Sequence, residues 1–406
     1  MTAPSSTTRP AAAATPHASA ATTLLLAVAC GATVANIYYA QPLAGEIAAS
    51  LGMVPATAGL VVTMTQIGYA VGLFFLVPLA DLIENRRLIV VCSLLDALAL
   101  CGAALAPSAG AFLAAAAAIG VVSVAVQILI PLAAHLAPDA TRGRVVGTVT
   151  SGLMIGILAA RPLASLIAAE TSWRVVFFAS SALMVALAVV LARSLPYRAP
   201  ETRMSYLALI RSMARIVAET PILRLRAFYQ AMLFTSFSLF WTTSPLLLGG
   251  PDYRFTQRGI GLFALVGVSG AIAAPLAGRL ADRGWSRIAT GGAIALVALG
   301  LIVTMIAPQG STAALVGLLA AAVLIDFGVQ SNLVLGYRAI FNVAPLARAR
   351  MNGVYLAGLF AAGAVGSALG AFVFAHAGWR AAATLGLLFP ALAMARFLAA
   401  VARGRE

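Results

Sequence analysis

Three charged residues lie inside long apolar stretches of this sequence, where a charge is costly. Asp96 and Asp326 are carboxylic acids and Arg161 carries a guanidinium. A charge at the middle of a bilayer costs about 2.5–3.5 kcal/mol, so each should face a cavity or a partner. In a cavity, Arg161 could attract an anionic group or tune a carboxylate, and Asp326 could bind and release a proton.

We assign proton coupling to Asp326 and Arg161. Burial raises the pKa of a carboxylic acid and a nearby arginine lowers it, so exposure to two aqueous sides in turn would change proton occupancy. The alternatives are a permanently paired or hydrogen-bonded Asp326, and an Arg161 ion pair that only holds helices together. Asp96 has no polar companion at helical spacing, which favours a structural role.

Uncharged polar and aromatic residues in the same stretches could line the rest of such a cavity. A stripe at helical spacing in the seventh stretch begins at Gln230 and passes through Phe234 and Phe237. Such a stripe is more often helix packing, although Gln230 at its head favours a cavity. The predicted lining residues are Asn36, Tyr39, Gln66, Gln127, Arg161, Gln230, Trp241, Gln330, Asn352 and Tyr355.

The elements that must position these residues are membrane spans. The 406 residues are 62% hydrophobic and 9% charged, and a soluble chain of this length could not bury so much apolar surface. Runs of about 20 apolar residues match the hydrocarbon core of a bilayer. The predicted spans are 22–43, 57–79, 86–106, 110–136, 145–168, 174–193, 222–247, 258–281, 287–307, 312–338, 351–374 and 379–401.

The positive charge is distributed to one side of these spans. All 26 basic residues are arginine, and with the N-terminus inside we place 21 of them in the cytoplasm. Arg174, Arg254, Arg258 and Arg380 fall in the opposite loops and Arg161 lies within a span. This positive-inside bias predicts an inner-membrane protein with both termini cytoplasmic. It disfavours a nucleic-acid partner, which would need a basic face outside the bilayer.

The lack of lysine excludes some chemistry. A Walker A phosphate loop and a Schiff base both need a lysine, so we expect no ATP binding of that kind. Three cysteines inside predicted spans make no disulfide framework. His17, His135 and His376 are scattered, so we predict no metal site, no cofactor and no enzyme activity. Leu24–Cys30 could pass for a signal-peptide core, but the apolar run continues, which favours an uncleaved first span.

Short patterns recur about two hundred residues apart. The Asp81 loop, Arg142-Gly143-Arg144 and Trp173-Arg174 return at Asp282, Arg348-Ala349-Arg350 and Trp379-Arg380. Chance recurrence could explain one match but hardly three in order. We therefore predict a disordered cytoplasmic tail over 1–21, bundles of six helices over 22–193 and 222–402, a cytoplasmic linker over 194–221 and a tail over 403–406. The linker should hold an amphipathic stretch near 206–217 on the membrane face.

Glycines one helical turn apart occur in three spans, at Gly68 and Gly72, at Gly152 and Gly156, and at Gly366 and Gly370. Small residues at this spacing let helix backbones approach closely. We expect packing within the chain rather than a dimerisation face.

These residues resemble the major facilitator superfamily in its twelve-span form. The loop between spans 2 and 3 matches the family motif at Asp81, Arg86 and Arg87, although Val77, Leu82 and Glu84 depart from it. The second copy keeps Gly278, Asp282, Arg283 and Gly284. Asn36–Pro42, Gly156–Arg161 and Asp326–Gln330 look like a bacterial branch related to drug and sugar efflux proteins.

The resemblance implies an all-α membrane fold of twelve helices in two pseudo-symmetric bundles. A cavity between the bundles would open to either side in turn, and Asp81, Arg86, Arg87, Gly278, Asp282 and Arg283 would form a cytoplasmic latch. The alternative is that these loop charges set topology only. Many drug–proton antiporters of the family carry an arginine in span 4, whereas this chain has Gln127 there, so coupling should use Arg161 with Asp326.

We predict a secondary active transporter that moves a small organic solute through the lipid bilayer by proton-coupled efflux, as an antiporter and as a monomer. Uptake by proton symport or uniport is the alternative, because no residue fixes the direction. A membrane enzyme would need a nucleophile–base pair or metal ligands in one cavity. A transporter-like membrane sensor would need a sizeable soluble output domain, for which the linker and tails are too short.

Overall fold

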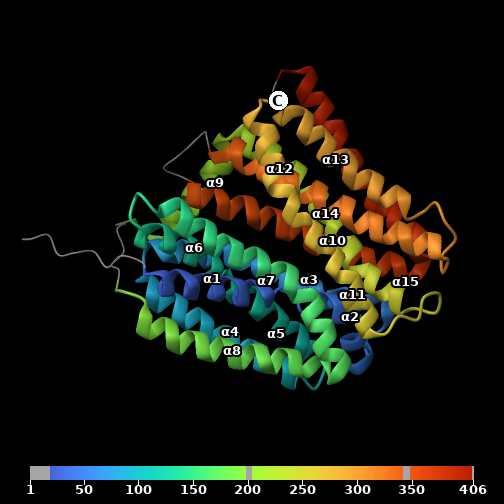
Figure 1. Ribbon diagram of the computed structural model, residues 1–406, viewed down its shortest axis with the longest axis horizontal. Coiled ribbons are helices and arrows are strands. Elements are labelled where there is room, and N and C mark those ends of the chain that lie inside the picture. The colour runs from blue at the N-terminus through green and yellow to red at the C-terminus, as the bar shows by residue number, and fades with distance from the viewer. Residues whose placement is uncertain (1–18, 198–203, 342–347, 405–406) are drawn as a thin grey trace, which may run out of the picture.

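Long helices arranged in two groups make up the protein. A computed structural model describes residues 19–197, 204–341 and 348–404. In Figure 1 the first group, coloured blue to green, lies below the second, coloured yellow to red. The first group consists of α1 (Ala20–Ala35), α2 (Ala40–Ser50), η1 (Pro55–Thr57), α3 (Leu60–Phe75), η2 (Val77–Asp81), α4 (Asn85–Leu105), α5 (Ala109–Val122), η3 (Ser123–Ala125), α6 (Val126–Leu136), α7 (Arg142–Glu170) and α8 (Trp173–Ser194).

The second group follows the short helix α9 (Tyr206–Glu219). Its elements are α10 (Pro221–Gly249), α11 (Gln257–Ala264), η4 (Leu265–Ser269), α12 (Gly270–Asp282), α13 (Ser286–Val303), α14 (Thr312–Phe341) and α15 (Arg348–Ala402). Helix α9 confirms a helix near 206–217. Its buried residues, Leu209 and Met213, lie one turn apart, as expected for an amphipathic helix.

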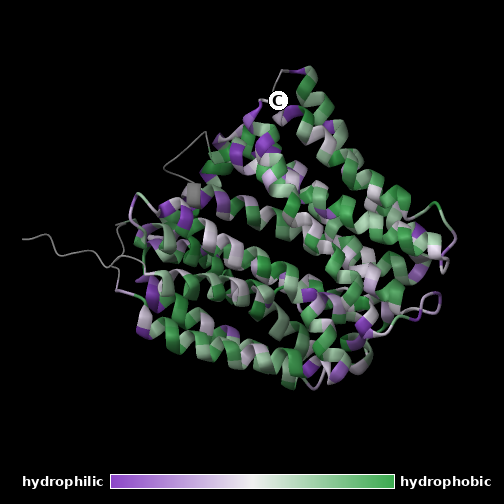
Figure 2. Ribbon diagram, in the orientation of Figure 1, coloured by the Kyte–Doolittle hydropathy of each residue, from purple (hydrophilic) through white to green (hydrophobic). Residues whose placement is uncertain are grey.

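The predicted spans agree closely with the helices. The described residues hold eleven continuous apolar helical stretches long enough to cross a membrane, and the last runs from Arg350 to Ala402. That stretch is interrupted at Gly378, whose φ of 75° lies in the left-handed region that glycine tolerates best, so it forms two spans. Figure 2 shows hydrophobic residues along most of each helix and hydrophilic ones gathered near the ends. The protein is therefore an all-helical, multi-pass membrane protein.

The first span is broken at its middle, which the sequence did not predict. Helix α1 ends at Ala35, helix α2 begins at Ala40, and a turn occupies residues 36–39. Asn36 lies at the end of α1, and its side-chain amide is bonded across the bundle. Its Nδ2 donates to Asp96 Oδ2 at 2.8 Å, and its Oδ1 accepts from Ser180 Oγ at 2.6 Å.

Asp96 is the centre of a buried polar cluster in the first group. Besides the Asn36 bond, its Oδ2 accepts from Ser123 Oγ at 3.2 Å. Ser123 begins the 3-10 turn η3, which interrupts the fourth span. Asp96 is therefore bonded to residues at the breaks in two spans, the first and the fourth. The partners of Asp96 come from other helices, which explains why its own helix showed no companion. These contacts support the structural role expected of Asp96.

The spaced glycines pack helices against each other within the chain. A Cβ at Gly68 would lie 2.0 Å from Ala117 O, and one at Gly366 would lie 2.1 Å from Thr235 O. Helix α7 packs on α1 in the same way, since a Cβ at Gly156 would lie 2.2 Å from Gly31 O. Spans 1 and 5 of the first group thus pair as spans 7 and 11 of the second do, through α10 and α15. The prediction of intrachain packing is confirmed at these positions.

Alanine at Gly366 is expected to destabilise the protein. The added methyl group would collide with the Thr235 carbonyl, and overpacking of this kind costs about 1–3 kcal/mol. The midpoint of thermal unfolding of the detergent-purified protein should fall. Gly358→Ala in the same helix is the matched control, because its Cβ would meet nothing within 4 Å. Equal midpoints for the two variants would contradict close packing at Gly366.

The two loop motifs are held differently. Glu84 caps α4 by accepting from the backbone N–H groups of Arg86 and Arg87 at 3.0 and 2.7 Å. The start of α4 is therefore stabilised by Glu84. In the second motif Asp282 forms an ion pair with Arg338. Arg338 also donates to Gly278 O at 2.7 Å, which ties both motif residues to α14.

Candidate functional site

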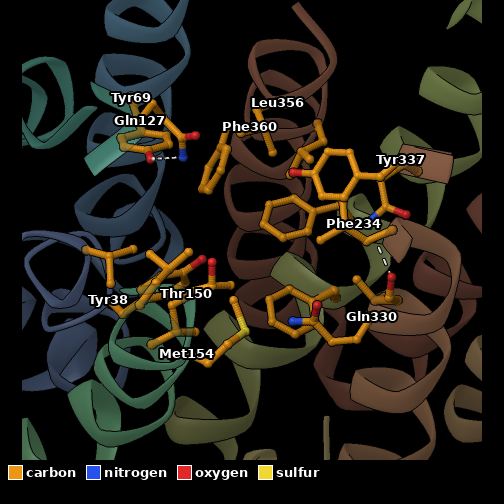
Figure 3. Close-up of a pocket in the computed structure, with 18 of the residues that line it drawn as sticks. Tyr38, Tyr69, Gln127, Thr150, Met154, Phe234, Gln330, Tyr337, Leu356 and Phe360 are labelled. Atoms are coloured by element: carbon orange, nitrogen blue, oxygen red, sulfur yellow. Dashed lines mark hydrogen bonds between the residues drawn. The ribbon is translucent and has the colours of Figure 1, made fainter. Parts of the chain in front are cut away.

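A cavity of about 570 Å³ lies between the two groups of helices. In Figure 3, Tyr38, Tyr69, Gln127, Thr150 and Met154 of the first group face Phe234, Gln330, Tyr337, Leu356 and Phe360 of the second. The lining also includes Arg161, Gln230, Phe237, Gly267, Asp326 and Asn352. Most of the wall is aromatic or aliphatic, with a few polar groups, which is the usual composition of a small-molecule site.

Six of the predicted cavity and coupling residues line this space: Gln127, Arg161, Gln230, Asp326, Gln330 and Asn352. Gln127 and Asn352 meet across the cavity, where Asn352 Nδ2 donates to Gln127 Oε1 at 3.2 Å. Gln230 is bonded within its own group, because its Oε1 accepts from Asn332 Nδ2 at 2.7 Å. The stripe on α10 turns towards the cavity at Phe234 and Phe237.

Three predicted lining residues of the first group are placed outside the lining. Asn36 belongs to the Asp96 cluster, and the turn at 36–39 directs Tyr38 instead of Tyr39 to the cavity. Gln66 joins the two groups instead, since its Nε2 donates to Ser238 Oγ at 2.8 Å and its Oε1 accepts from Ser367 Oγ at 3.1 Å.

Trp241 and Tyr355 also lie outside the lining. Trp241 is fully buried directly behind Arg161 and Asp326, so it contacts the polar residues of the cavity without facing it. Tyr355 is buried beside Tyr337, with ring centroids 5.5 Å apart, and Tyr337 takes the lining position. In both cases the predicted residue lies in the correct part of its helix, but its side chain is buried behind the residues that line the cavity.

Arg161 is buried and surrounded by aromatic rings. Its side chain is 4% exposed, and its guanidinium lies 4.5 Å from the ring centroid of Trp241, 5.2 Å from that of Tyr38 and 5.3 Å from that of Phe237. Each such contact gains about 0.5–2 kcal/mol, which offsets part of the cost of burial. Arg161 Nε donates to Gln41 Oε1 at 2.7 Å. Its Nη1 and Nη2 have no hydrogen-bond partner among the described residues.

Asp326 lies next to this guanidinium without pairing to it directly. Its Oδ1 accepts from Trp241 Nε1 at 2.7 Å. Its other oxygen and the guanidinium both lie next to Gly267. A Cβ built at Gly267 would lie 3.0 Å from Asp326 Oδ2 and 3.5 Å from Arg161 Nη1. The two charges therefore attract each other at short range, while Oδ2 and both terminal nitrogens keep unused hydrogen-bonding capacity within the described parts of the chain.

Alanine at Gly267 is expected to lower transport without unfolding the protein. The new methyl group would press on Asp326 Oδ2 and would lie 3.2 Å from Trp241 Cζ2, so these groups must shift. We expect about a tenfold loss of transport rate per folded protein, as for one weakened charged hydrogen bond. Gly292→Ala, whose Cβ would meet nothing within 4 Å, is the control. Flux assays on equal amounts of monodisperse protein should separate the variants.

One end of the cavity is closed by contacts between the groups. Gln257 Nε2 donates to Glu46 Oε2 at 3.2 Å, and Arg258 forms an ion pair with Glu170. Helix α3 packs on α15 nearby, where Thr63 Oγ1 and Ser367 Oγ lie 2.9 Å apart. The lining extends the other way, to Thr150 near the start of α7 and Phe341 at the end of α14.

Sequence reasoning missed the aromatic residues of the lining. Tyr69 and Phe360 pack edge to face across the cavity, with centroids 4.5 Å apart, and Tyr337 stacks on Phe341. In an apolar span such residues cannot be distinguished from ordinary packing. The only available signal was the stripe on α10, whose Phe234 packs on Phe360.

Comparison with known proteins shows what this arrangement resembles. The family model described as Major Facilitator Superfamily matches residues 23–333 and 226–406. "Uncharacterized transporter YgaY" of Escherichia coli O157:H7 is 39% identical over 356 residues, covering 88% of this chain and 89% of that protein. "Probable transporter SCO4007" of Streptomyces coelicolor is 34% identical over 356 residues, covering 87% and 82%.

Two solved structures share the fold at low sequence identity. The nucleoside transporter NupG has a TM-score of 0.73 and 16% identity, covering 95% of this chain and 99% of that one. A bacterial homolog of the human lysosomal transporter Spinster, in an inward-facing conformation, has a TM-score of 0.70 and 13% identity, covering 93% and 96%.

Proposed function

Because the chain belongs to the major facilitator superfamily and is a membrane transporter, we propose that it exports a small organic solute in exchange for protons. The observation that carries this proposal is the placement of Arg161 and Asp326. Both charges line the cavity between the two groups, and neither is consumed by a direct ion pair with the other. A carboxylic acid in this position can change its proton occupancy when the cavity changes the side to which it opens.

Alternating access would proceed by exchange of the contacts at the two ends of the cavity. The bonds of Gln66 to Ser238 and Ser367, and that of Gln257 to Glu46, would break when the closed end opens. The opposite end would then close. A solute or a proton biases this exchange only through its different affinity for the two states.

The arginine distribution supports cytoplasmic termini and therefore an orientation for the cavity. With the start of α1 in the cytoplasm, the end of the cavity near Thr150 and Phe341 faces the cytoplasm. The described state is then inward-facing, in an inner membrane. This state would load a cytoplasmic solute and release a proton inside, as export by antiport requires.

The loop motifs would act as latches for the cytoplasmic ends of the helices. In the second motif the ion pair of Asp282 with Arg338 would hold α12 against α14. Asp81, Arg86 and Arg87 would play the corresponding part in the first group, with Arg86 Nη1 donating to Leu195 O at 3.3 Å. The division into two bundles joined by 194–221 and the monomeric state belong to the same proposal.

Uptake by proton symport and uniport are the competing modes, and a flux assay separates all three. The purified protein would be reconstituted in liposomes and a pH gradient imposed in either direction, with a panel of labelled solutes inside. Antiport predicts that an acidic exterior accelerates efflux of the labelled solute in either orientation of the protein, because the solute moves against the inward flow of protons. Flux that ignores the gradient would exclude proton coupling, and co-directional flux of solute and proton would establish symport.

A further inference from the structure

The polar groups left open in the cavity define the kind of solute that fits. Around Asp326, hydrogen-bonding capacity within the described residues of the lining is unused at Arg161 Nη1, at Asp326 Oδ2 and at the side-chain amide of Gln330. Gln127 and Gln230, by contrast, are bonded to neighbouring side chains. Gln330 lies one turn after Asp326 on α14. Both side chains are on the face that packs on Gly270, because a Cβ at Gly270 would contact Gln330 Cγ and Asp326 Cβ. The open groups therefore form one patch.

This patch presents a donor beside an acceptor. The guanidinium can only donate, and the Asp326 carboxylate can only accept. Both groups lie next to Gly267. A bound anion would therefore be repelled by the charge of Asp326, and a bound cation by the charge of Arg161. A neutral group with an N–H or O–H next to a carbonyl oxygen satisfies both without either repulsion.

The surrounding wall selects the body of the solute. The rings of Tyr38 and Phe237 lie against Arg161, and Phe234 and Phe360 continue this aromatic wall of the cavity. Phe234 and Phe237 stack on each other with centroids 5.1 Å apart. Planar groups gain most from such faces, through stacking and apolar burial.

We propose that the solute is a small, neutral, planar molecule that presents an N–H donor beside a carbonyl acceptor, as amides, ureides and lactams do. The carbonyl oxygen accepts from Arg161 and the N–H donates to Asp326 Oδ2. This assignment rests on the proposed function, because it names the solute of the same cavity.

The same geometry makes the solute and the proton compete. Trp241 Nε1–H occupies Asp326 Oδ1, so a proton taken from water is added to Oδ2. Oδ2 then becomes a donor and can no longer accept from the solute N–H. The charged and titratable groups that face Asp326 are Arg161 of α7 and Tyr38 of the turn after α1, while η4 presents Gly267 and α12 presents Gly270. Solute binding therefore expels the proton to water, and protonation expels the solute.

The test uses four benzene derivatives of nearly equal shape, measured by calorimetry on the full-length protein in detergent. Benzamide carries the donor and the acceptor. N,N-dimethylbenzamide lacks the donor, benzoate is an anion and benzamidinium is a cation. We expect benzamide to bind at least about tenfold more tightly than the other three at neutral or higher pH, as one charged hydrogen bond allows. Its affinity should fall by about tenfold per pH unit once acidification has protonated most of the protein at Asp326.

Two variants assign the effect to this patch. Asp326→Asn, which presents an amide N–H in place of Oδ2, should lose the preference for benzamide and its pH dependence. Asp96→Asn removes a buried carboxylate outside the cavity and should keep both. The proposed solute class is wrong if the wild-type protein does not bind benzamide. It is also wrong if the wild-type protein binds benzamide no more tightly than N,N-dimethylbenzamide, benzoate or benzamidinium. If benzoate or benzamidinium binds most tightly and its flux responds to an imposed pH gradient, the solute class is wrong but proton coupling is supported. If no solute flux responds to the gradient, proton coupling is wrong.

Discussion

Asparagine in place of Asp326 is expected to abolish proton-coupled flux while the protein accumulates normally in the membrane. The amide has nearly the same shape, and its oxygen can still accept from Trp241 Nε1. It cannot ionise, so the side chain no longer differs between the two aqueous sides. In reconstituted vesicles an imposed pH gradient should change the wild-type flux and leave the variant flux unchanged.

Asp96→Asn is the matched control for this variant. It also removes a buried carboxylate from a span, but its bonds to Asn36 and Ser123 lie in the interior of the first group. We expect lower thermal stability and a retained response to the gradient. A full gradient response in Asp326→Asn at normal protein level would remove Asp326 from the mechanism.

Glutamine in place of Arg161 should lower the transport rate about tenfold to hundredfold. The substitution removes a charged donor that faces the cavity, and hydrogen bonds to charged groups contribute about 1.5–3 kcal/mol. It also leaves Asp326 without its neighbouring cation and Gln41 without its donor. Initial rates per folded protein, compared with the wild type, measure the loss.

A second substitution separates the charge of Arg161 from its shape. Lysine keeps the positive charge but lacks the planar fork and its stacking on Trp241, so Arg161→Lys should recover only part of the rate. Arg174→Gln is the control, because Arg174 stacks on Trp173 at 4.3 Å in the same manner but outside the cavity. Equal loss of rate in the Arg174 and Arg161 variants would show that the effect is only structural.

The fold could be predicted from the sequence because the bilayer constrains it so strongly. Apolar runs of fixed length, arginine on one side and the repeated motifs were enough to place the spans, most of them within about three residues of their observed ends, although the first runs to Ser50 and not to residue 43. Arg161 and Asp326 could be found for the same reason. A charge in a span must have a polar environment, and these two residues share one.

The remaining lining residues could not be placed, because helical spacing holds only along an unbroken helix. The turn at 36–39 rotates Tyr38 into the position expected of Tyr39, and the bond from Asn36 to Asp96 that accompanies this turn joins residues 60 positions apart. Gln66 is a second case. Its side chain is used to join the two groups at Ser238 and Ser367, which no property of its own helix indicates.

The most direct measurement is infrared difference spectroscopy of the membrane-reconstituted protein as the pH is lowered. Uptake of a proton by a carboxylate creates the carbonyl stretch of a carboxylic acid, whereas a group that never changes its protonation cancels from the difference spectrum. The exposed carboxylates contribute to this band in every variant, so the test is the difference between variants. We predict that the wild type and Asp96→Asn share a component of the band that is missing from Asp326→Asn. Equal bands in the wild type and in Asp326→Asn would show that Asp326 does not take up the proton.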